Sequence, residues 1–318
     1  MSAADTTAAV AGAPSVPAAV EAHAPEPKAS FRDTWWRHLV GIVAAVIALF
    51  PVAYIVSSAF NADQTLSGST LIPTHMTLHN FGDLLHNNVR QSGGGKADAP
   101  FLNWYLNSII VAGGAAILTV LLGALAAYAF SRFRFRGRRL GMTMLLLIQM
   151  FPQFLAIVAI YLIVRNVGNI FPAIGLDKFL ALIFVYLGGA MGVNVWLMKG
   201  FFDTIPAELD ESARVDGATP GQVFWGVVLP LALPVLAVVG LISFVFTLNE
   251  FIIASALLTT TKHFTLSVGL FGFISQQYGQ RWGPFTAGAL LVLIPVVALF
   301  MFLQKWIVSG LTAGSVKG

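Results

Sequence analysis

The acidic side chains of this sequence, which could bind a basic partner or perform acid–base chemistry, are concentrated in one segment. Residues 203–230 read DTIPAELDESARVDGATPGQVFWGVVLP. Catalysis would need recognisable groupings, and the chain contains no zinc motif, nucleophile elbow or phosphate loop. We therefore expect no catalytic residue, no metal and no cofactor in this chain, and we interpret the segment as a docking element. Its acids are Asp203, Glu208, Asp210, Glu211 and Asp216.

Two short helices are predicted to position these acids. Pro206 and the acids after it are typical of a helix start, and Gly217 is typical of the residue that follows a helix end. The first helix is therefore expected from about Pro206 to Asp216. The sequence Thr219-Pro220-Gly221-Gln222 matches a capping box, so the second helix is expected to begin at once. Together they would form a rigid helix–turn–helix across one face of a membrane.

The composition of the first helix indicates the kind of partner that it suits. Small residues give it a thin surface that fits a cleft, and Glu208 and Glu211 offer charge at the rim. A helix that lies on lipid would instead carry Lys and Arg opposite bulky apolar residues, and the negative inner leaflet disfavours acids. An ordinary capped cytoplasmic loop is the alternative on these residues alone. The small residues are Ala207, Ser212, Ala213, Gly217 and Ala218.

The rest of the chain is apolar. Of its 318 residues, 57% are hydrophobic and 10% are charged, and the mean hydropathy is +0.80. A soluble domain would carry roughly a quarter charged residues, and the lack of cysteine excludes disulfides and thiol chemistry. We predict an all-α integral membrane protein with six transmembrane helices, the fifth bent at its start by Pro230 and Pro234. The stretches that supply the roughly 20 apolar residues needed for a crossing are 39–60, 104–130, 140–164, 179–198, 227–249 and 285–308.

The basic residues predict the orientation of these spans. If the N-terminus is cytoplasmic, the inner segments hold twelve Lys and Arg and the outer segments hold six. Five arginines occur in SRFRFRGRR, residues 131–139, and such a loop resists translocation. We therefore expect a multi-pass protein with both termini in the cytoplasm. The basic residues lie at the ends of apolar runs, where contact with membrane lipid explains them better than nucleic acid does.

The spans give a predicted organisation of the chain. Residues 1–30 are rich in Ala and Pro and lack an apolar core, so they are expected to be a disordered cytoplasmic tail. The further parts are an interfacial segment with the first helix at 31–60, an extracytoplasmic loop at 61–103, a five-helix core at 104–308 that includes a cytoplasmic loop at 199–226, and a cytoplasmic C-terminal tail at 309–318.

Two further sets of polar residues could contact a transported molecule. The loop before the last span combines hydrogen-bonding groups with an aromatic ring, which suits a sugar or a sugar-binding protein, although an interfacial aromatic belt would look similar. It contains Gln276, Gln277, Tyr278 and Gln280. Polar residues within the spans could line a translocation path, or could bridge packed helices as Gly188 and Gly192 are expected to do by close contact. They are Gln149, Asn194, Asn249 and Glu250.

The segment 203–230 resembles the EAA loop of ATP-binding-cassette (ABC) importer permeases. That loop reads E-A-A, three residues, G, nine residues and I-x-L-P. Here Glu211-Ser212-Ala213 is followed by Gly217 and then by VVLP at residues 227–230, with Ser212 in place of Ala and Val227 in place of Ile. The stretches LIQMFP, VYLGG, VDGATP and VSGLTAGSVKG extend the likeness to the MalG-type permeases of maltose and maltodextrin importers, over residues 35–318.

The resemblance implies a fold, partners and site residues. The fold would be that of a type I ABC importer permease in a bacterial inner membrane. The partners would be a MalF-type permease, two copies of a MalK-type ATPase that bind ATP and Mg²⁺, and an extracytoplasmic sugar-binding protein. The first helix would couple to the ATPase, through Glu208, Glu211, Ser212, Ala213, Asp216, Gly217, Ala218 and Pro230. The C-terminal tail would lie at the ATPase interface, through Leu311, Thr312, Ala313, Gly314 and Lys317.

Two rival functions are weaker on the sequence. An ion-coupled carrier places ionisable residues at mid-membrane at a cost of about 2.5–3.5 kcal/mol each, and the six stretches have essentially none there. A membrane enzyme would need catalytic groupings that are missing. Within ABC importers, the expected cargo is maltose or maltodextrin, with trehalose, cyclodextrin or another oligosaccharide as the alternative.

Overall fold

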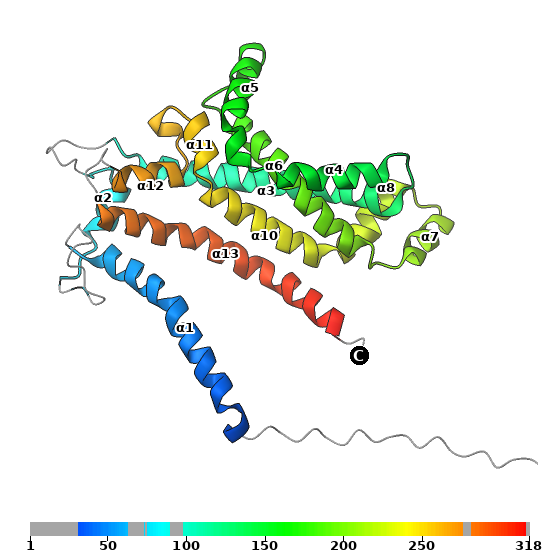
Figure 1. Ribbon diagram of the computed structural model, residues 1–318, viewed down its shortest axis with the longest axis horizontal. Helices are drawn as coiled ribbons and strands as arrows, with labels where there is room; N and C mark the ends of the chain where they lie inside the picture. The colour runs from blue at the N-terminus through cyan, green and yellow to red at the C-terminus, as the bar shows by residue number, and fades with distance from the viewer. Residues whose placement is uncertain (1–30, 63–72, 74, 90–97, 276–280, 316–318) are drawn as a thin grey trace, which may run out of the picture. The chain divides into compact units, whose positions relative to one another are not determined.

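The computed structural model describes residues 31–62, 73, 75–89, 98–275 and 281–315 (Figure 1). These residues form two units that divide at Pro51, and helix α1 (Phe31–Phe60) runs across the division. Within the described residues every regular element is helical, and the only strand-like pairing is an isolated bridge between Asn61 and Met76. In this described part of the chain, five helices are long and apolar enough to cross a membrane, or six if one bent pair counts as a single span. The predicted all-α membrane fold is confirmed.

Four of the six predicted spans match single helices. They fall within α1, α3, α6 and α13, whose apolar side chains supply the hydrophobic length that a crossing requires. The bounds beyond α1 are Phe101–Arg132 for α3, Phe179–Phe202 for α6 and Trp282–Ser315 for α13.

The bounds predicted for the third span, 140–164, are wrong, because the chain there forms two separate helices. Helix α4 (Arg138–Met150) ends before Pro152, a short turn η1 (Gln153–Ala156) follows, and α5 (Ile157–Ile170) begins the next helix. Proline disfavours the helical conformation at the residue before it, and Phe151 is accordingly extended. The apolar helix of sufficient length is Gln153–Ile170, and Figure 1 shows α5 projecting away from the line of α4.

The predicted bend at the start of the fifth span is confirmed. The helical stretch Pro220–Leu231 meets α10 (Leu233–Asn249) at an angle of 77°. Pro230 and Pro234 flank the break, and each lacks the N–H that would continue the helical hydrogen bonding. The stretch before the break consists of α8 (Pro220–Val223), a wider turn η3 (Phe224–Val228) and α9 (Leu229–Leu231).

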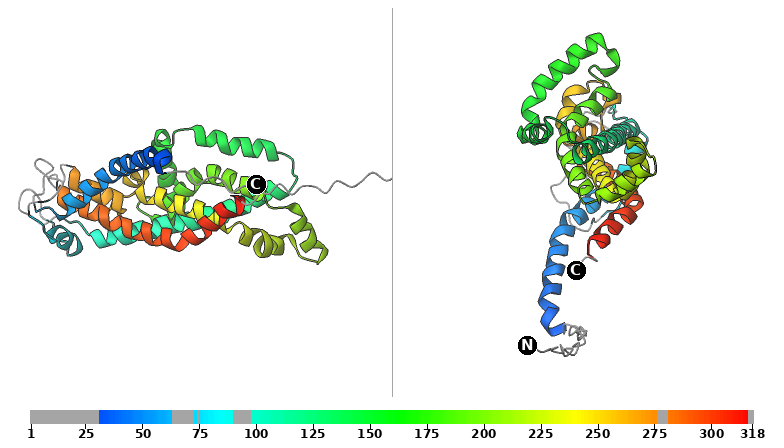
Figure 2. Two further views of the ribbon diagram at one scale, coloured as in Figure 1. Left: turned by 90° about the horizontal axis from the view of Figure 1, so that it is seen from below. Right: turned by 90° about the vertical axis from the view of Figure 1, so that its right-hand side faces the viewer.

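Short helices lie at both ends of the second unit. Helix α7 (Ala207–Val215) and α8 occupy one end, which is also where the loop between α3 and α4 lies (Figures 1 and 2). The other end is formed by α2 (His79–Leu85), α11 (Ile252–Leu257), η4 (Thr261–His263) and α12 (Leu266–Ile274).

Helix α3 is central to the packing, because it contacts both α6 and α10 along its length. A close approach at Gly269 brings α12 against α3: a Cβ at this position would lie 2.2 Å from the indole of Trp104. Trp104 itself is fully buried. At the other end, Val195, Met198 and Phe202 of α6 share one buried cluster with residues of α8 and η3. The core therefore reaches from the spans to the base of α7 and α8.

Candidate functional site

The predicted first helix of the acidic segment is confirmed as α7, which ends in a tight glycine turn. Gly217 has a φ of +87°, a value that favours glycine because it has no side chain to clash. The N–H of Ala218 donates to Ala213 O at 2.9 Å, and the N–H of Gly217 donates to Arg214 O at 3.0 Å. These two bonds form a Schellman motif, which fixes the direction in which the chain leaves the helix.

The predicted capping box of α8 is also present. Gln222 N–H donates to Thr219 Oγ1 at 3.4 Å, and Thr219 N–H donates to Gln222 Oε1 at 2.8 Å. Two donors that would lack partners at the helix start are thereby satisfied. Because both caps are local, α7, the turn at Gly217 and α8 form one stiff unit.

The outward face of this unit is acidic and mostly small, as the sequence predicted. Val215 at its tip is 87% exposed. Ala213 and Ala218 differ from the prediction, because they pack against the buried cluster of α6 and α8 and so hold the unit to the core. Pro230 is exposed on α9, next to the break in the fifth span. The acids and small residues that are exposed are Ala207, Glu208, Glu211, Ser212, Asp216 and Gly217.

A buried ion pair between α3 and α7 was missed by sequence reasoning. Arg132 Nε lies 2.9 Å from Asp210 Oδ2, and the two side chains are 10% and 5% exposed. Arg132 Nη2 also donates to Ile205 O at 2.9 Å, just before α7. The sequence placed Arg132 among the loop arginines and Asp210 among the acids. The available signal was the i, i+3 spacing of Asp210 and Ala213, which puts both on one helix face.

Two neighbouring contacts tie the same end of α3 to the end of α6 and to η3. Ser131 Oγ donates to Asp203 Oδ1 at 2.7 Å, and Lys199 pairs with the other carboxylate oxygen. Partial burial favours the protonated acid, but the hydrogen bonds from Lys199 and Ser131 outweigh it and lower the pKa of Asp203. The ring of Tyr128 packs against Phe224 with centroids 5.0 Å apart. The basic loop, α6 and the acidic unit are thus one connected assembly.

The polar residues within the spans bridge neighbouring helices in two cases. Asn194 Nδ2 on α6 donates to Ser243 Oγ on α10 at 3.2 Å. The Gln149 amide on α4 donates to the carbonyl of Gly189 on α6. Asn249 is exposed and donates to Val245 O of its own helix at 2.8 Å. Of these three, Asn249 has the free surface that a translocation path requires.

The sequence predicted close helix contacts at Gly188 and Gly192, and the structure shows them at Gly189 and Gly192. A Cβ at Gly192 would lie 2.5 Å from Gln149 Cγ, and one at Gly189 would lie 2.5 Å from the Gln153 amide. A Cβ at Gly188 would meet nothing within 4 Å, so the prediction for Gly188 is wrong. Glycine is needed where the Gln149 and Gln153 side chains cross α6.

Glu250 caps a helix at the far end of the fifth span. Its carboxylate accepts hydrogen bonds from Ile253 N–H at 2.8 Å and Ala254 N–H at 3.0 Å, and also from the Tyr186 hydroxyl. The two backbone donors are the otherwise unpaired groups at the start of α11. The carboxylate is therefore committed to local structure.

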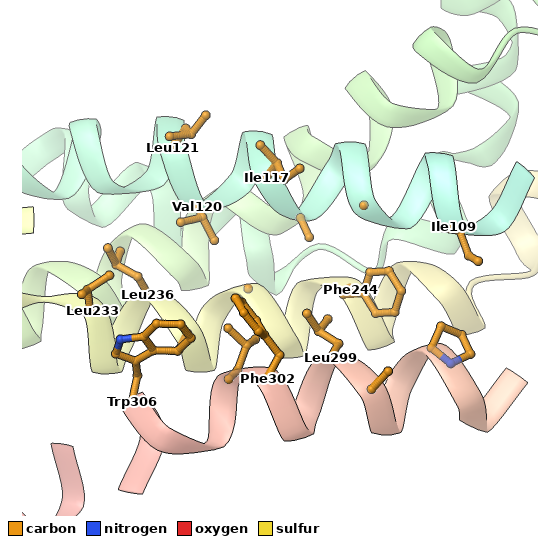
Figure 3. Close-up of a pocket in the computed structure, with 17 residues that line it drawn as sticks. Ile109, Ile117, Val120, Leu121, Leu233, Leu236, Phe244, Leu299, Phe302 and Trp306 are labelled. Carbon is orange, nitrogen blue, oxygen red and sulfur yellow. The ribbon is translucent and has the colours of Figure 1, made fainter. Parts of the chain in front are cut away.

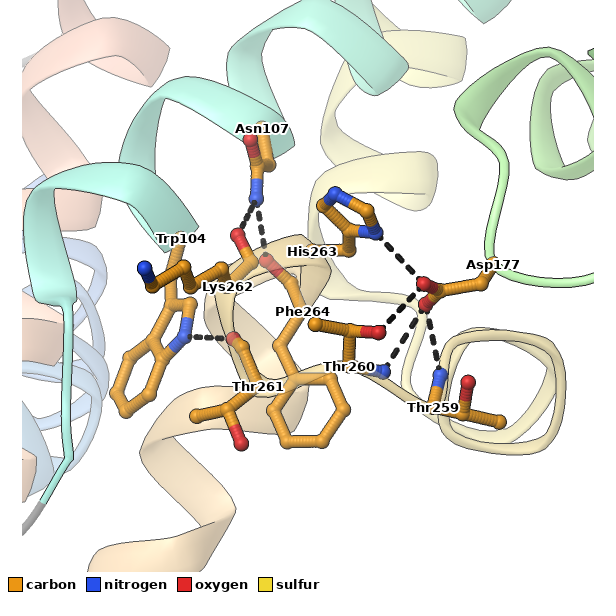
Figure 4. A network of polar contacts seen from close by, with 9 residues as sticks. All are labelled: Trp104, Asn107, Asp177, Thr259, Thr260, Thr261, Lys262, His263 and Phe264. Atoms are coloured by element: carbon orange, nitrogen blue, oxygen red, sulfur yellow. Dashed lines mark hydrogen bonds and ion pairs between the residues drawn. The ribbon is translucent and has the colours of Figure 1, made fainter.

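Hydrogen bonds from α3 hold the loop between α11 and α12 in place, at the end opposite α7 (Figure 4). Trp104 Nε1 on α3 donates to Thr261 O at 2.7 Å, and Asn107 Nδ2 donates to the carbonyls of Lys262 and Phe264 at 2.9 and 3.0 Å. The Asn107 amide thus spans three residues of the loop, which holds its backbone to α3.

Asp177 holds the same loop from the other side. Its carboxylate accepts from the N–H groups of Thr259 and Thr260 at 2.9 and 3.0 Å, from Thr260 Oγ1 at 2.6 Å and from His263 Nδ1 at 2.7 Å (Figure 4). Partial burial favours the protonated form, but these hydrogen bonds outweigh it and lower the pKa of Asp177 to about 2. The turn before α6 is thereby joined to the loop before α12.

A groove among three of the long helices is apolar. It has a volume of about 740 Å³ and lies between α3, α10 and α13, where Ile117, Phe244 and Phe302 point into it (Figure 3). A sugar site needs several convergent hydrogen-bonding groups. This groove lacks them, so it is not a sugar site.

The remaining predicted residues lie at the edge of the described structure. The loop residues Gln276, Gln277, Tyr278 and Gln280, and Lys317 of the C-terminal tail, fall outside the described residues. The backbone of Leu311 to Gly314 continues α13, which ends at Ser315, so this part of the predicted tail is helical. Within the described residues no group of three His, Cys, Asp or Glu could hold a metal ion.

Comparison with known proteins gives the class. Residues 119–313 match the family described as binding-protein-dependent transport system inner membrane component, and the chain belongs to this family of transport permeases. It is similar to the galactooligosaccharides transport permease GanQ of Bacillus subtilis, with 39% identity over 86% of this chain and 92% of the relative. It is similar to the maltose/maltodextrin permease MalG of Escherichia coli K12, with 38% identity over 92% and 99%.

The fold agrees with this class. A crystal structure of a bacterial ABC transporter that imports alginate contains a chain that superposes with a TM-score of 0.69, at 24% identity, over 88% of this chain and 99% of that one. The protein is an ABC importer permease of the MalG type and a membrane component rather than a catalytic subunit.

Proposed function

We propose that this permease moves maltodextrins into the cell by alternating access, and that the energy comes from ATP hydrolysed in partner chains. The names of the MalG relatives support this cargo. The similar identity to a galactooligosaccharide permease makes a galactoside oligomer the second candidate. In both cases the ligand is a neutral oligosaccharide. ATP and Mg²⁺ are bound by the partner and not by this chain.

The observation that carries the proposal is the stiff, outward-facing unit of α7, Gly217 and α8. Glu208 and Glu211 are exposed on α7, where they can pair with basic groups at the rim of a cleft in an ATPase subunit. The Schellman motif at the end of α7 and the capping box at the start of α8 together fix the turn between the two helices. A capped helix transmits a displacement, whereas a flexible loop would absorb it.

The buried Arg132–Asp210 pair gives that displacement a route into the membrane. It joins α7 to the end of α3, and α3 packs against α6 and α10. Movement of α7 with a closing ATPase dimer would therefore carry three spans as one body. Alternating access of this kind is a two-state change that ligands bias at both ends.

The assembly that this function requires has several chains. The chain pairs with a MalF-type permease, and two copies of a MalK-type ATPase dock on the cytoplasmic side, one of them on α7. An extracytoplasmic sugar-binding protein docks at the opposite end, where Gln276, Gln277, Tyr278 and Gln280 contact it or its sugar. Both termini are cytoplasmic. The C-terminal residues Leu311, Thr312, Ala313, Gly314 and Lys317 contact the ATPase interface.

The residues within the spans have a smaller part in this function. Asn249 is exposed and can face the translocation path, whereas Gln149 and Asn194 already bridge helices. An ion-coupled carrier would need a membrane-embedded carboxylate that is free to bind and release a proton. Glu250 is occupied by two backbone N–H groups and a tyrosine hydroxyl, which favours energy supplied from outside the chain.

Glu211→Lys tests the proposal in the reconstituted importer with its binding protein. We expect loss of sugar-stimulated ATPase activity with normal membrane insertion, because a reversed charge meets the basic rim of the cleft. Glu26→Lys, an equal charge change outside the family match, is the control and should behave as wild type. Normal stimulated activity in Glu211→Lys would contradict the coupling role. A panel of maltodextrins and galactooligosaccharides in the same assay identifies the cargo.

A further inference from the structure

A mixed polar and apolar groove lies between α4 and α6, beside the basic loop. Its volume is about 690 Å³, and side chains from both helices line it. Three basic residues that line it, Arg138, Arg139 and Lys199, are together called its basic end, and the acid Asp203, which pairs with Lys199, also lines the groove. Met142 and Trp196 supply apolar surface, and Trp196 is 53% exposed. The groove therefore joins cationic groups to apolar side chains on two helices.

The basic end of the groove has more positive charge than its neighbours neutralise. Among the described residues, the carboxylates that pair with this region are Asp203, held by Lys199 and Ser131, and Asp210, held by Arg132. Arg139 is exposed and forms no ion pair with a described carboxylate. Helix α4 also begins at Arg138, and the positive end of its dipole adds to the field.

The apolar surroundings indicate the rest of the ligand. No residue of α4 is buried, and most of its apolar side chains are exposed, although Leu145 packs against the core. Tryptophan at this level is typical of the membrane interface, where its ring lies beside lipid head groups. A free anion would contact the arginines alone and leave the apolar side chains exposed. A molecule with a phosphate and acyl chains would contact both the arginines and the apolar side chains.

We propose that this groove is a binding site for one anionic phospholipid, with its phosphate between Arg138, Arg139 and Lys199 and an acyl chain along Met142 and Trp196. Basic pockets between membrane helices bind anionic head groups in this way. The leaflet follows from the orientation proposed above, but the site does not depend on the coupling role of α7. A bound lipid here would brace α4 against α6, next to the residues that hold α7.

Brominated lipids test the site on the full chain, because bromine quenches tryptophan at close range. The signal of Trp196 is obtained as the difference between the wild type and Trp196→Phe. We expect dibromo-phosphatidylglycerol to quench it at a far lower mole fraction than dibromo-phosphatidylcholine. In Arg138→Gln/Arg139→Gln this preference should fall roughly 30-fold, since each arginine near an anionic lipid surface raises the affinity by a factor of about 5 to 6 and the two factors multiply. 

The matched control is Arg134→Gln/Arg136→Gln, which removes the same charge from the same loop but from residues that do not line this groove. It should retain the preference. Equal losses in both double variants would show diffuse attraction to the membrane and overturn the site, as would equal quenching of wild-type Trp196 by both lipids. Displacement of the lipid by excess inorganic phosphate would assign the groove to a free anion and overturn the lipid proposal.

Discussion

Arg132 Nε and Asp210 Oδ2, of residues 78 positions apart in the sequence, are 2.9 Å apart in a buried ion pair that connects α3 and α7. The second oxygen, Asp210 Oδ1, is buried and has no hydrogen-bond partner in the described structure. A carboxylate with one oxygen unpaired depends strongly on the cation at the other. The attachment of α7 to α3 therefore rests on Arg132.

Arg132→Gln is expected to destabilise the protein. Removal of one partner from a buried pair costs about 3–5 kcal/mol because the other charge is left uncompensated. The thermal midpoint of the purified chain should fall, and the sugar-stimulated ATPase activity of the importer should fall with it.

The double variant Arg132→Met/Asp210→Leu replaces the ion pair with an apolar contact between α3 and α7. It tests whether the instability of Arg132→Gln comes from the carboxylate that is left without a cation. An apolar pair of similar volume often restores stability, so the thermal midpoint should recover most of the loss. If the double variant is no more stable than Arg132→Gln alone, the ion pair is not the cause of the defect.

Gly217→Ala is expected to weaken the turn between α7 and α8. A φ of +87° strains any residue that has a Cβ, and the left-handed conformation costs roughly 1–2 kcal/mol. Gly217→Asn should be milder, because asparagine tolerates positive φ better than alanine does. Transport assays of the two variants should rank them in this order. An alanine variant as active as the wild type would show that the turn is not needed in this form.

Gly269→Ala is expected to disrupt the opposite end of the molecule. The new Cβ would lie 2.2 Å from Trp104, so the indole must move and lose its hydrogen bond to Thr261 O. Tryptophan fluorescence and proteolysis of the loop between α11 and α12 should both change. Gly221→Ala is the control, because a Cβ there meets nothing within 4 Å.

Asp177→Asn should lower stability in a pH-dependent way. The pKa of Asp177 is about 2 in the folded chain and 3.8 in the reference state. A lowered folded-state pKa stabilises the protein above the reference value and ceases to do so as pH falls from about 4 towards 2. The gap in thermal midpoint between wild type and variant should thus be constant at neutral pH and close in acid. A gap that persists unchanged at pH 2 would rule out the charged form of Asp177 as its cause.

The sequence predicted those features of the fold that depend on residues close together in the chain. The bounds of α7, the glycine turn after it and the Thr219–Gln222 box follow from local caps, and Pro230 with Pro234 indicated the bend. A hydropathy run does not show where one helix ends and the next begins, so the third span was placed at 140–164, across the break at Pro152.

Local sequence patterns did not predict the contacts between residues that are far apart in the sequence. Arg132 and Asp210, and Asp177 with the loop at 259–264, are brought together by packing of whole helices. One sequence carries no periodicity that links such pairs. Ala213 illustrates the same limit, since its small size suggested an exposed surface and the fold uses it to pack against the core.

A cysteine crosslink from α7 to the ATPase during ATP turnover tests the central claim most directly. The chain has no native cysteine, so Glu211→Cys gives a single attachment point on the exposed face of α7, and Met76→Cys gives an exposed control at the opposite end. We expect the cysteine at position 211 to crosslink to the ATPase subunit throughout the ATP cycle, and the cysteine at position 76 not to do so. If the cysteine at position 211 reacts only with water-soluble thiol reagents in the assembled, hydrolysing importer, the claim that α7 contacts the ATPase is contradicted.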